Sequence, residues 1–397
     1  MIRHLFTLIW NRKRSNFLLI GEIVLSFFVL FVVCSLLVYN YRNYRQPLGF
    51  DYQNVWQVQV NPGQDSTDRT ATMQRLMQRL KSLPGVVSVT TSSPNSPFSF
   101  STMNTERWYQ QQRSPVSERY EADDDFAKTL RLDVVEGRWF DRRDDAGTHP
   151  PMVVNRAFAE AVFGQESPLG KVVTDEKATR RYQVVGVIDK YRSGSDFFED
   201  SPAFFERHVL QDSSGRIRPT ESPLLLIRVQ PGSGAVLEQQ LIKEIKGVTK
   251  TWITTVDTLG KLRQEKLKFV LTPMYALGLI CVFLIINVAL GLFGVLWYNI
   301  SQRRAEIGLR RALGATGPGI GAQFLGEMLV VTTLGVLLGG LLAAQFPLLG
   351  VFDVAAPVYL LAMLMATVLI FALTAVCAFQ PSRMAAAVQP AVSLREE

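Results

Sequence analysis

The chain has 397 residues, of which 48% are hydrophobic and 19% charged, and its formal net charge is +7. Its mean hydropathy of +0.13 exceeds that of most soluble domains, so membrane residence is the first expectation. Much of the positive charge flanks apolar segments and no zinc-finger or RNP-like pattern accompanies it, which argues against a nucleic-acid partner. The three cysteines, Cys34, Cys281 and Cys377, lie in apolar segments, so we expect no disulfide elsewhere in the chain.

The amino-terminal segment, residues 1–16, is basic, and we expect it to form a cytoplasmic amphipathic helix. The apolar run that follows, residues 17–39, is long enough to cross a hydrocarbon core of about 30 Å. Because it lacks the small-residue cleavage site of a secretory signal, we interpret it as a retained first transmembrane helix.

Residues 40–268 have the pattern of a mixed α/β domain. The strand Val55–Val60 alternates with period two, and Thr70–Leu83 carries the apolar stripe of an amphipathic helix before another strand begins. A similar order returns with the strand Leu224–Gln230 and the helix Ala235–Lys246. This repeated order indicates two βαβ elements that share one sheet.

A strand-rich block, Asp125 to about Arg228, separates these two elements, and we interpret it as a subdomain inserted into the first. The acidic run Asp123–Asp125 shows no partner in the sequence, so we expect a solvated loop there. The three histidines, His4, His149 and His208, lack ligand spacing, so no metal site is predicted. No catalytic constellation is recognisable.

Three further apolar runs predict transmembrane helices at residues 269–298, 322–346 and 357–379. The charged segment before the first of these runs into it without a Gly or Pro until Pro273. A helix from Leu259 to Tyr298 would be about 60 Å long, roughly twice the hydrocarbon thickness. We therefore expect its outer part to project from the membrane as a stalk.

The distribution of positive charge predicts the topology. It places the amino terminus, the loop 299–321 and the tail 380–397 in the cytoplasm. The short link 347–356 contains no Lys or Arg, and we expect it outside together with the domain 40–268. The predicted fold is thus four transmembrane α-helices with an α/β periplasmic domain inserted between helices 1 and 2.

The cytoplasmic loop contains a compact basic helix that begins near Ser301. Small or apolar residues form one stripe at helical spacing, and the arginines lie off that stripe. The stripe comprises Ala305, Gly308, Leu309 and Ala312. Glu306 can pair with Arg310 one turn later, which is worth about 0.2 to 0.5 kcal/mol.

Two interpretations of this helix remain open. A basic loop lying on anionic lipid explains the arginines. A docking helix that inserts into a groove of a cytoplasmic protein also explains the small-residue stripe and the abrupt stop at Gly314.

Two pairs of residues inside the predicted spans carry further hypotheses. Glu22 and Glu327 are intramembrane ionisable groups near the cytoplasmic ends, and we favour pairing with a cationic neighbour over proton coupling. Gly335 and Gly339 form a G-x-x-x-G pair, which indicates either close helix packing or a chance match.

The stretch QRRAEIGLRRALGAT resembles the signature of the FtsX-like permease module of ABC transporters, in which this helix couples to the ATPase. The phrases LKSLPGVVSV, VVEGRWF, VVNRAFAEAVFGQESPLGKVV and YQVVGVIDKY resemble the external domain of the MacB-type branch. The resemblance covers essentially the whole chain. The coupling residues that it implies are Arg303, Arg304, Glu306, Ile307, Gly308, Arg310, Arg311, Leu313 and Gly314.

The resemblance also implies an assembly in the bacterial inner membrane. Its expected parts are a second permease, as a homodimer or heterodimer, and cytoplasmic ABC ATPase subunits that bind ATP and Mg. A periplasmic adaptor, an outer-membrane duct and membrane lipid are further expected partners. The sequence holds no G-x-x-x-x-G-K-[ST] loop, so we expect no cofactor and no ATPase activity in this chain.

Three functions fit this resemblance. The first is efflux of a periplasmic substrate such as a peptide or antibiotic, and the external-domain phrases favour it. The second is lipoprotein release of the LolC and LolE kind, which would require an apolar cleft for which Phe27, Phe28 and Phe31 are candidates. The third is FtsX-like signalling to cell-wall hydrolases.

Overall fold

The computed structural model describes residues 13–63, 69–208 and 224–386, which form two compact units. The external unit is Asn43–Val270, and the remaining described residues form the membrane unit. Most of the expected amino-terminal amphipathic helix and the last eleven residues of the chain lie outside the described ranges.

The membrane unit contains four helices that are long and apolar enough to cross a membrane, counted over the described residues. They are α2 (Lys13–Tyr44), α7 (Leu259–Gln302), α9 (Gly317–Ala343) with its extension α10 (Gln345–Leu349), and α11 (Ala356–Ala386). The short helix α8 (Arg304–Ala312) follows α7, and the turn η2 (Val351–Asp353) follows α10. The predicted number and order of the spans are confirmed.

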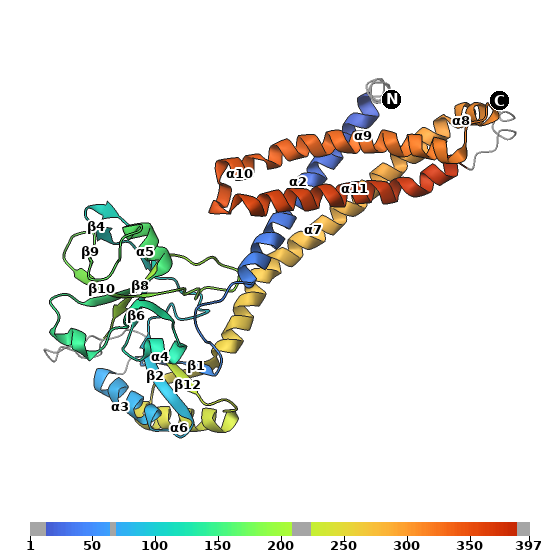
Figure 1. Ribbon diagram of the computed structural model, residues 1–397. Coiled ribbons are helices and arrows are strands. Elements are labelled where there is room, and N and C mark those ends of the chain that lie inside the picture. The colour runs from blue at the N-terminus through green and yellow to red at the C-terminus, as the bar shows by residue number, and fades with distance from the viewer. Residues whose placement is uncertain (1–12, 64–68, 209–223, 387–397) are drawn as a thin grey trace. The chain divides into compact units, whose positions relative to one another are not determined.

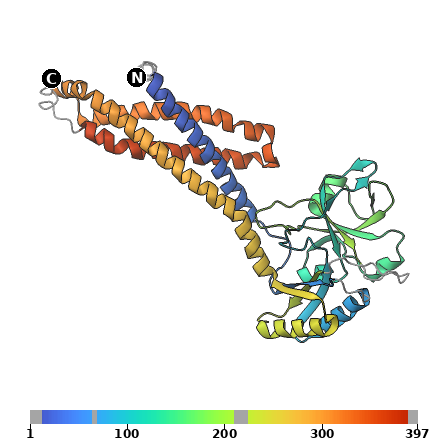
Figure 2. The same cartoon turned by 180° about the vertical axis from the view of Figure 1, so that it is seen from behind.

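The membrane unit has an apolar core. Helices α9 and α11 run side by side in both views (Figure 1, Figure 2), and the buried hydroxyls of Thr332 and Thr374 lie 3.1 Å apart between them. On α2, Ile23, Phe27 and Phe31 are almost completely buried. Large apolar side chains on other faces of these helices are exposed, as expected for surfaces that contact lipid or a second subunit.

The external unit is one mixed sheet with helices. Its strands are β1 (Val55–Asn61), β2 (Val86–Ser92), β3 (Asn104–Thr105), β4 (Trp108–Tyr109), β5 (Gln112–Arg113), β6 (Ser117–Ala122), β7 (Val134–Gly137), β8 (Pro151–Asn155), β9 (Val172–Thr174), β10 (Arg181–Ile188), β11 (Ala203–Arg207), β12 (Leu224–Val229) and β13 (Ile253–Thr258). Its helices are α3 (Arg69–Lys81), α4 (Phe126–Leu130), η1 (Arg142–Ala146), α5 (Arg156–Phe163) and α6 (Ala235–Thr249). The main strand order is β13-β1-β12-β2-β6-β11-β8-β10-β9-β4-β5.

The two strand–helix–strand elements are present, and they share the sheet as predicted. Their strands interleave, because β12 pairs antiparallel with both β1 and β2, and β1 pairs antiparallel with β13. Helices α3 and α6 lie side by side on this half of the sheet (Figure 1). Leu76, Leu80, Leu241 and Ile245 are fully buried in the core that they share, so each amphipathic stripe faces the strands.

The remaining strands form the second half of the same sheet, which begins earlier in the chain than expected. Strands β3 to β6 precede Asp125, and β6 joins the halves by pairing with β2 on one side and β11 on the other. An aromatic cluster fills the core under β6 and β11, with Tyr120, Tyr191 and Phe205 packed at ring distances of 5.0 Å.

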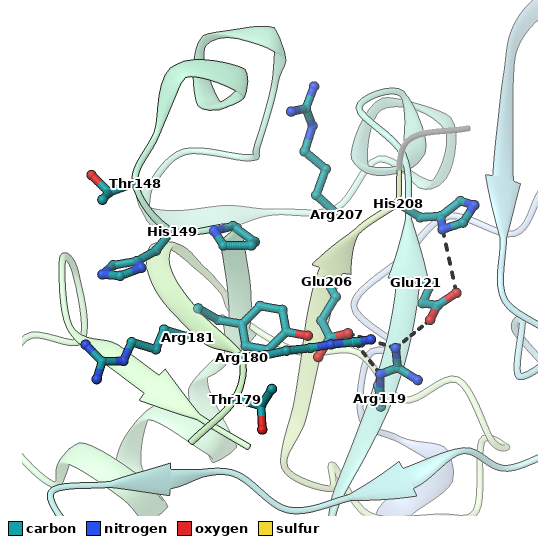
Figure 3. A pocket seen from close by; sticks show the side chains of 12 residues that line it. Arg119, Glu121, Thr148, His149, Thr179, Arg180, Arg181, Glu206, Arg207 and His208 are labelled. Atoms are coloured by element: carbon teal, nitrogen blue, oxygen red, sulfur yellow. Dashed lines mark hydrogen bonds and ion pairs between the residues drawn. The ribbon is translucent and has the colours of Figure 1, made fainter. Parts of the chain in front are cut away.

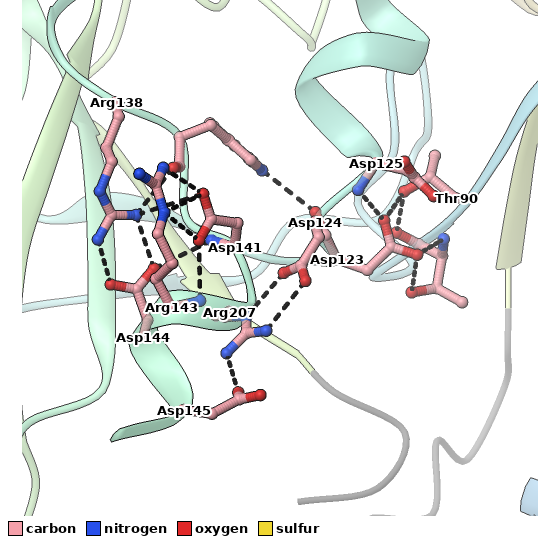
Figure 4. A network of polar contacts seen from close by, with 12 residues as sticks. Thr90, Asp123, Asp124, Asp125, Arg138, Asp141, Arg143, Asp144, Asp145 and Arg207 are labelled. Atoms are coloured by element: carbon pink, nitrogen blue, oxygen red, sulfur yellow. Dashed lines mark hydrogen bonds and ion pairs between the residues drawn. The ribbon is translucent and has the colours of Figure 1, made fainter. Parts of the chain in front are cut away.

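The acidic run Asp123–Asp125 is paired, so the expectation of a solvated loop is wrong (Figure 4). Asp123 accepts hydrogen bonds from the Thr90 hydroxyl and from the Thr91 amide, the latter at 2.9 Å. Asp124 binds Arg207 at 2.7 and 2.9 Å, and Asp125 binds Lys81 at 2.5 Å. These partners come from distant parts of the chain, which the sequence alone could not bring together.

The burial of Asp123 makes the stability of the external unit depend on pH. Burial raises the pKa of Asp123 to about 6, although hydrogen bonds from Thr90 and Thr91 act in the opposite direction. Because the folded pKa exceeds the unfolded value near 3.9, the folded state holds the proton more tightly. The contribution of Asp123 to stability is therefore greatest below about pH 4 and is lost as the pH rises through 6.

We predict that Asp123→Asn removes this loss. Between pH 4 and pH 7 the wild-type chain should lose about 1 to 3 kcal/mol relative to the variant, at about 1.4 kcal/mol per pKa unit. Thermal unfolding of both proteins in detergent across this range measures the difference. Parallel pH profiles for the two proteins would show that Asp123 does not titrate in this way.

Candidate functional site

The basic helix predicted from the sequence is α8, and it continues α7 almost without interruption. Only Arg303 separates the two helices, and the backbone bonds from Arg303 N to Ile300 O (3.2 Å) and from Ile307 N to Arg303 O (2.8 Å) bridge this position. Gly314 adopts φ +95° and ends the segment. Thr316 then caps α9 by accepting from the Gly319 amide at 3.3 Å.

Helix α8 has a buried and an exposed face, and these differ from the stripe expected. Ile307 and Gly308 are buried in the chain itself. Leu309 and Leu313 are 53% and 80% exposed, and Ala312 is exposed beside them. Gly308 thus faces the protein's own core, and the surface open to a partner is the one that carries the two leucines.

A polar network ties α8 to α9. Arg303 binds the buried carboxylate of Glu327 at 3.2 Å, and Gln323 donates to the same carboxylate at 3.3 Å. Arg310 donates to Gln323 at 3.0 Å and also pairs with Glu306, as predicted from their spacing. The intramembrane Glu327 therefore has a cationic partner, and the network fixes α8 against the start of the third span. The side chains of Arg304 and Arg311 lie outside the described parts of the structure.

Glycines let α2 approach its neighbours closely. A Cβ atom at Gly335 or Gly339 of α9 would lie 2.6 Å from Ile23 or 2.7 Å from Phe27. On α7, a Cβ at Gly291 would lie 2.5 Å from the Glu22 carboxylate. Glu22 is thus placed against the backbone of α7, and the G-x-x-x-G pair faces the first span.

A second set of contacts is made by residues Tyr191–Phe198 of the external unit. We name this segment the junction loop. The side chain of Arg192 is buried, and it donates to backbone carbonyls inside this loop and in the segment where α2 ends. It reaches Asn43 O (3.0 Å) in the last turn of α2 and Gln46 O (2.9 Å) just after that helix, and Phe198 O (2.9 Å) within the loop. The Asn43 side chain returns a bond to Phe197 O at 3.0 Å.

The junction loop also holds the outer end of α7. The Asp196 carboxylate, only 7% exposed, accepts from Arg263 at distances from 2.6 to 3.1 Å. Arg263 also donates to the Tyr52 hydroxyl at 2.7 Å, and one turn later Lys266 donates to Ser99 O at 2.8 Å. One loop therefore binds the segment that leaves α2 and the segment that enters α7.

Sequence reasoning missed the junction loop. Its sequence, YRSGSDFF, is typical of a polar turn after a strand. The partners of Arg192 and Asp196 lie 149 and 67 positions away in the chain. The one available signal was an arginine and an aspartate in a Ser- and Gly-rich stretch next to aromatic residues.

An apolar cavity of about 370 Å³ lies in the membrane unit. Phe31, Val32 and Leu36 of α2 line one side, and Phe346 and Tyr359 from α10 and α11 line the other. Of the three phenylalanines considered for an apolar cleft, Phe31 lines this cavity, Phe28 packs on Phe346, and Phe27 is buried. No cluster of His, Cys, Asp and Glu suited to a metal ion occurs in the described residues.

Comparison with known protein families shows what these two units are. The family described as MacB-like periplasmic core domain matches residues 17–245, and the family described as FtsX-like permease C-terminal matches residues 278–390. This chain belongs to the MacB-like, FtsX-type ABC transporter permeases. The basic helix and the inserted α/β domain therefore belong to one known membrane-protein architecture.

Individual relatives are distant from this permease. It is 26% identical over 298 residues to an uncharacterized ABC transporter permease, YvrN, of Bacillus subtilis, with 70% of each chain covered. It is 26% identical over 276 residues to the macrolide export ATP-binding/permease protein MacB of Marinobacter nauticus, covering 66% of this chain and 41% of that protein. The crystal structure of the periplasmic region of MacB from Actinobacillus actinomycetemcomitans aligns with 57% of this chain and 95% of that one, at 17% identity and a TM-score of 0.39.

The glycine contacts predict a position-specific effect of an added methyl group. Gly339→Ala places a Cβ against the Phe27 ring, whereas Gly340→Ala, one residue later, meets nothing within 4 Å. Overpacking of this kind costs about 1 to 3 kcal/mol. Thermal unfolding in detergent should therefore show a lowered midpoint for the first variant and little change for the second. Equal midpoints would show that α2 does not pack on Gly339.

Proposed function

We propose that this chain is the permease subunit of a MacB-like transporter that uses ATP hydrolysis by a separate cytoplasmic ATPase to move its external domain. That movement would drive efflux of a periplasmic substrate such as a peptide or an antibiotic. The observation that carries the proposal is α7, an unbroken helix of 44 residues. Polar contacts hold both of its ends, at Arg303 and at Arg263.

The cytoplasmic end supports the proposal because α8 is fixed to the membrane unit while presenting an apolar face. Arg303, Glu327 and Gln323 restrain the helix, so a force applied to α8 is passed to α7 and α9. The exposed Leu309 and Leu313 provide the kind of apolar surface that a groove on a partner buries. The family implies that this partner is an ABC ATPase that binds ATP and Mg.

The outer end supports the proposal because the junction loop, which is part of the external unit, contacts both the end of α2 and the start of α7. In the chain, the loop lies between β10 and β11, which are interior strands of the second half of the sheet. Displacement of Arg263 would pull on Asp196 and, through the loop, on these strands. In the assembly we expect a second permease of the same or a related kind, a periplasmic adaptor and an outer-membrane duct.

The apolar cavity favours a second candidate function, the release of lipoproteins from the membrane. A lipid chain would fit between Phe31, Phe346 and Tyr359, where the described lining is almost entirely apolar. Purification of the complex with its ATPase followed by mass spectrometry of bound molecules distinguishes the two. A bound triacylated lipoprotein would replace the efflux proposal with lipoprotein release.

The exposed face of α8 predicts where the ATPase binds. Leu309→Asp and Leu313→Asp should each reduce co-purification of the ATPase subunit by about tenfold or more, because each places a charge in a buried apolar contact. The control is Leu348→Asp, which changes an exposed leucine (82%) of α10, outside α8. Retention of the ATPase by both α8 variants would remove α8 from the interface.

The junction loop predicts an uncoupled variant. Arg263→Ala leaves the buried Asp196 carboxylate without its cation, a change that typically costs about 3 to 5 kcal/mol. We expect this variant to retain the ATPase subunit but to lose ATP-dependent protection of the external domain against protease. Lys261→Ala, on the same helix with its side chain 60% exposed, is the matched control and should keep the protection. Normal protection in Arg263→Ala would show that Asp196 carries no coupling.

A further inference from the structure

The external unit contains a second polar feature, at one edge of its sheet, that the proposed function does not use. Strands β8 and β10 are parallel and start at this edge. Strand β11 runs antiparallel to β8, and β6 runs parallel to β11, so both end there. The topology thus brings the starts of two strands and the ends of two others together, with their flanking loops.

A cavity of about 570 Å³ lies at this edge (Figure 3). Its lining is basic and includes Arg119 of β6, Arg207 of β11, and the consecutive Arg180 and Arg181 at the start of β10. Two threonine hydroxyl side chains, from Thr148 and Thr179, line it as well. The volume is within the range of about 300 to 1,000 Å³ typical of small-molecule sites.

Part of the positive charge of the cavity lining is neutralised by neighbouring glutamates. Glu206 is buried and pairs with Arg119 at 2.9 Å and with Arg107 behind the cavity. Arg119 also binds Glu121 at 2.5 Å. These two arginines and two glutamates balance each other, so the acidic side chains in the lining are already satisfied and do not repel an incoming anion.

The arginines and glutamates that neutralise each other are also held in position. The Arg107 guanidinium lies 4.7 Å from the ring centre of Phe204 and 5.1 Å from that of Tyr182, and its side chain is only 7% exposed. Glu206 is therefore held from behind, and Arg119 is held by Glu206. The floor of the cavity is preorganised, which lowers the entropic cost of binding a ligand.

Arg180 and Arg181 are the charges that remain. Arg207 is neutralised by Asp124 and Asp145, whereas no acidic partner of the Arg180 or Arg181 side chain occurs among residues 13–63, 69–208 and 224–386. Figure 3 shows Arg180 extending toward Glu206 and Arg119 across the cavity. The cavity therefore carries two uncompensated guanidinium groups beside hydroxyl donors, a combination suited to oxyanions.

We propose that this cavity is a binding site for a small anionic ligand that carries carboxylate or phosphate groups, with Arg180 and Arg181 as its charge-pairing residues. Arg119, held by Glu206, forms the fixed wall of the site. This inference rests on the external unit alone and does not depend on coupling to an ATPase.

The test uses the full-length chain in nanodiscs of zwitterionic lipid, titrated with citrate and with inorganic phosphate by calorimetry at constant ionic strength. We expect saturable binding of at least one of these anions to one site per chain. The double variant Arg180→Gln/Arg181→Gln should weaken that binding by about tenfold or more. A response to citrate alone would identify carboxylate as the recognised group, and a response to phosphate alone would identify phosphate.

The control variant Arg142→Gln/Lys243→Gln removes the same charge from exposed positions outside the cavity, and its affinity should stay within about twofold of wild type. Equal weakening in both double variants would show that only the net charge of the chain attracts anions. Absence of saturable binding of either anion at millimolar concentration would overturn the proposal. Unchanged thermal unfolding of the Arg180→Gln/Arg181→Gln variant confirms that a loss of binding is not a loss of fold.

Discussion

A hydrocarbon core offers the backbone no hydrogen-bond partners, so a segment that crosses it must satisfy its own amides and carbonyls. Helix α7 does this over 44 residues, with Pro273 as its one interior proline, although about 20 residues suffice to cross. Residues up to Val270 belong to the external unit and the rest to the membrane unit. Because of the excess length, one continuous helix connects the α8 end of the membrane unit with the external unit.

A long helix transmits force only if its ends are held, and both ends of α7 are held by charges of low exposure. At one end Arg303 and Glu327 have side chains 12% and 11% exposed. At the other, Asp196 is 7% exposed beside Arg263. Breaking a buried pair costs far more than breaking a surface pair, so these contacts anchor α7 more firmly than a surface pair would. The surface pair of Glu306 and Arg310 on α8 contributes little by comparison.

Features with a local periodic signal were predictable from the sequence. The four spans follow from apolar length, and β1, α3, β12 and α6 follow from alternation or a helical stripe. The interleaving of the strands, the pairing of Asp123 with Thr90 and the junction loop depend on residues tens of positions apart, for which a single sequence holds no signal. The exposed face of α8 was misjudged for a related reason, since burial of Gly308 depends on the membrane unit around it.

We propose that nucleotide binding in the cytoplasm changes the external domain through α7. Hydrogen–deuterium exchange of the complex with its ATPase, with and without bound ATP, measures this change at the junction loop and at Asn43–Tyr52. We expect ATP to change exchange in both segments, and a flexible Gly-Gly-Ser insertion after Val270 to abolish that change while the ATPase stays bound. Exchange that does not depend on ATP in an active complex, or a response that survives the insertion, would show that α7 does not carry the change.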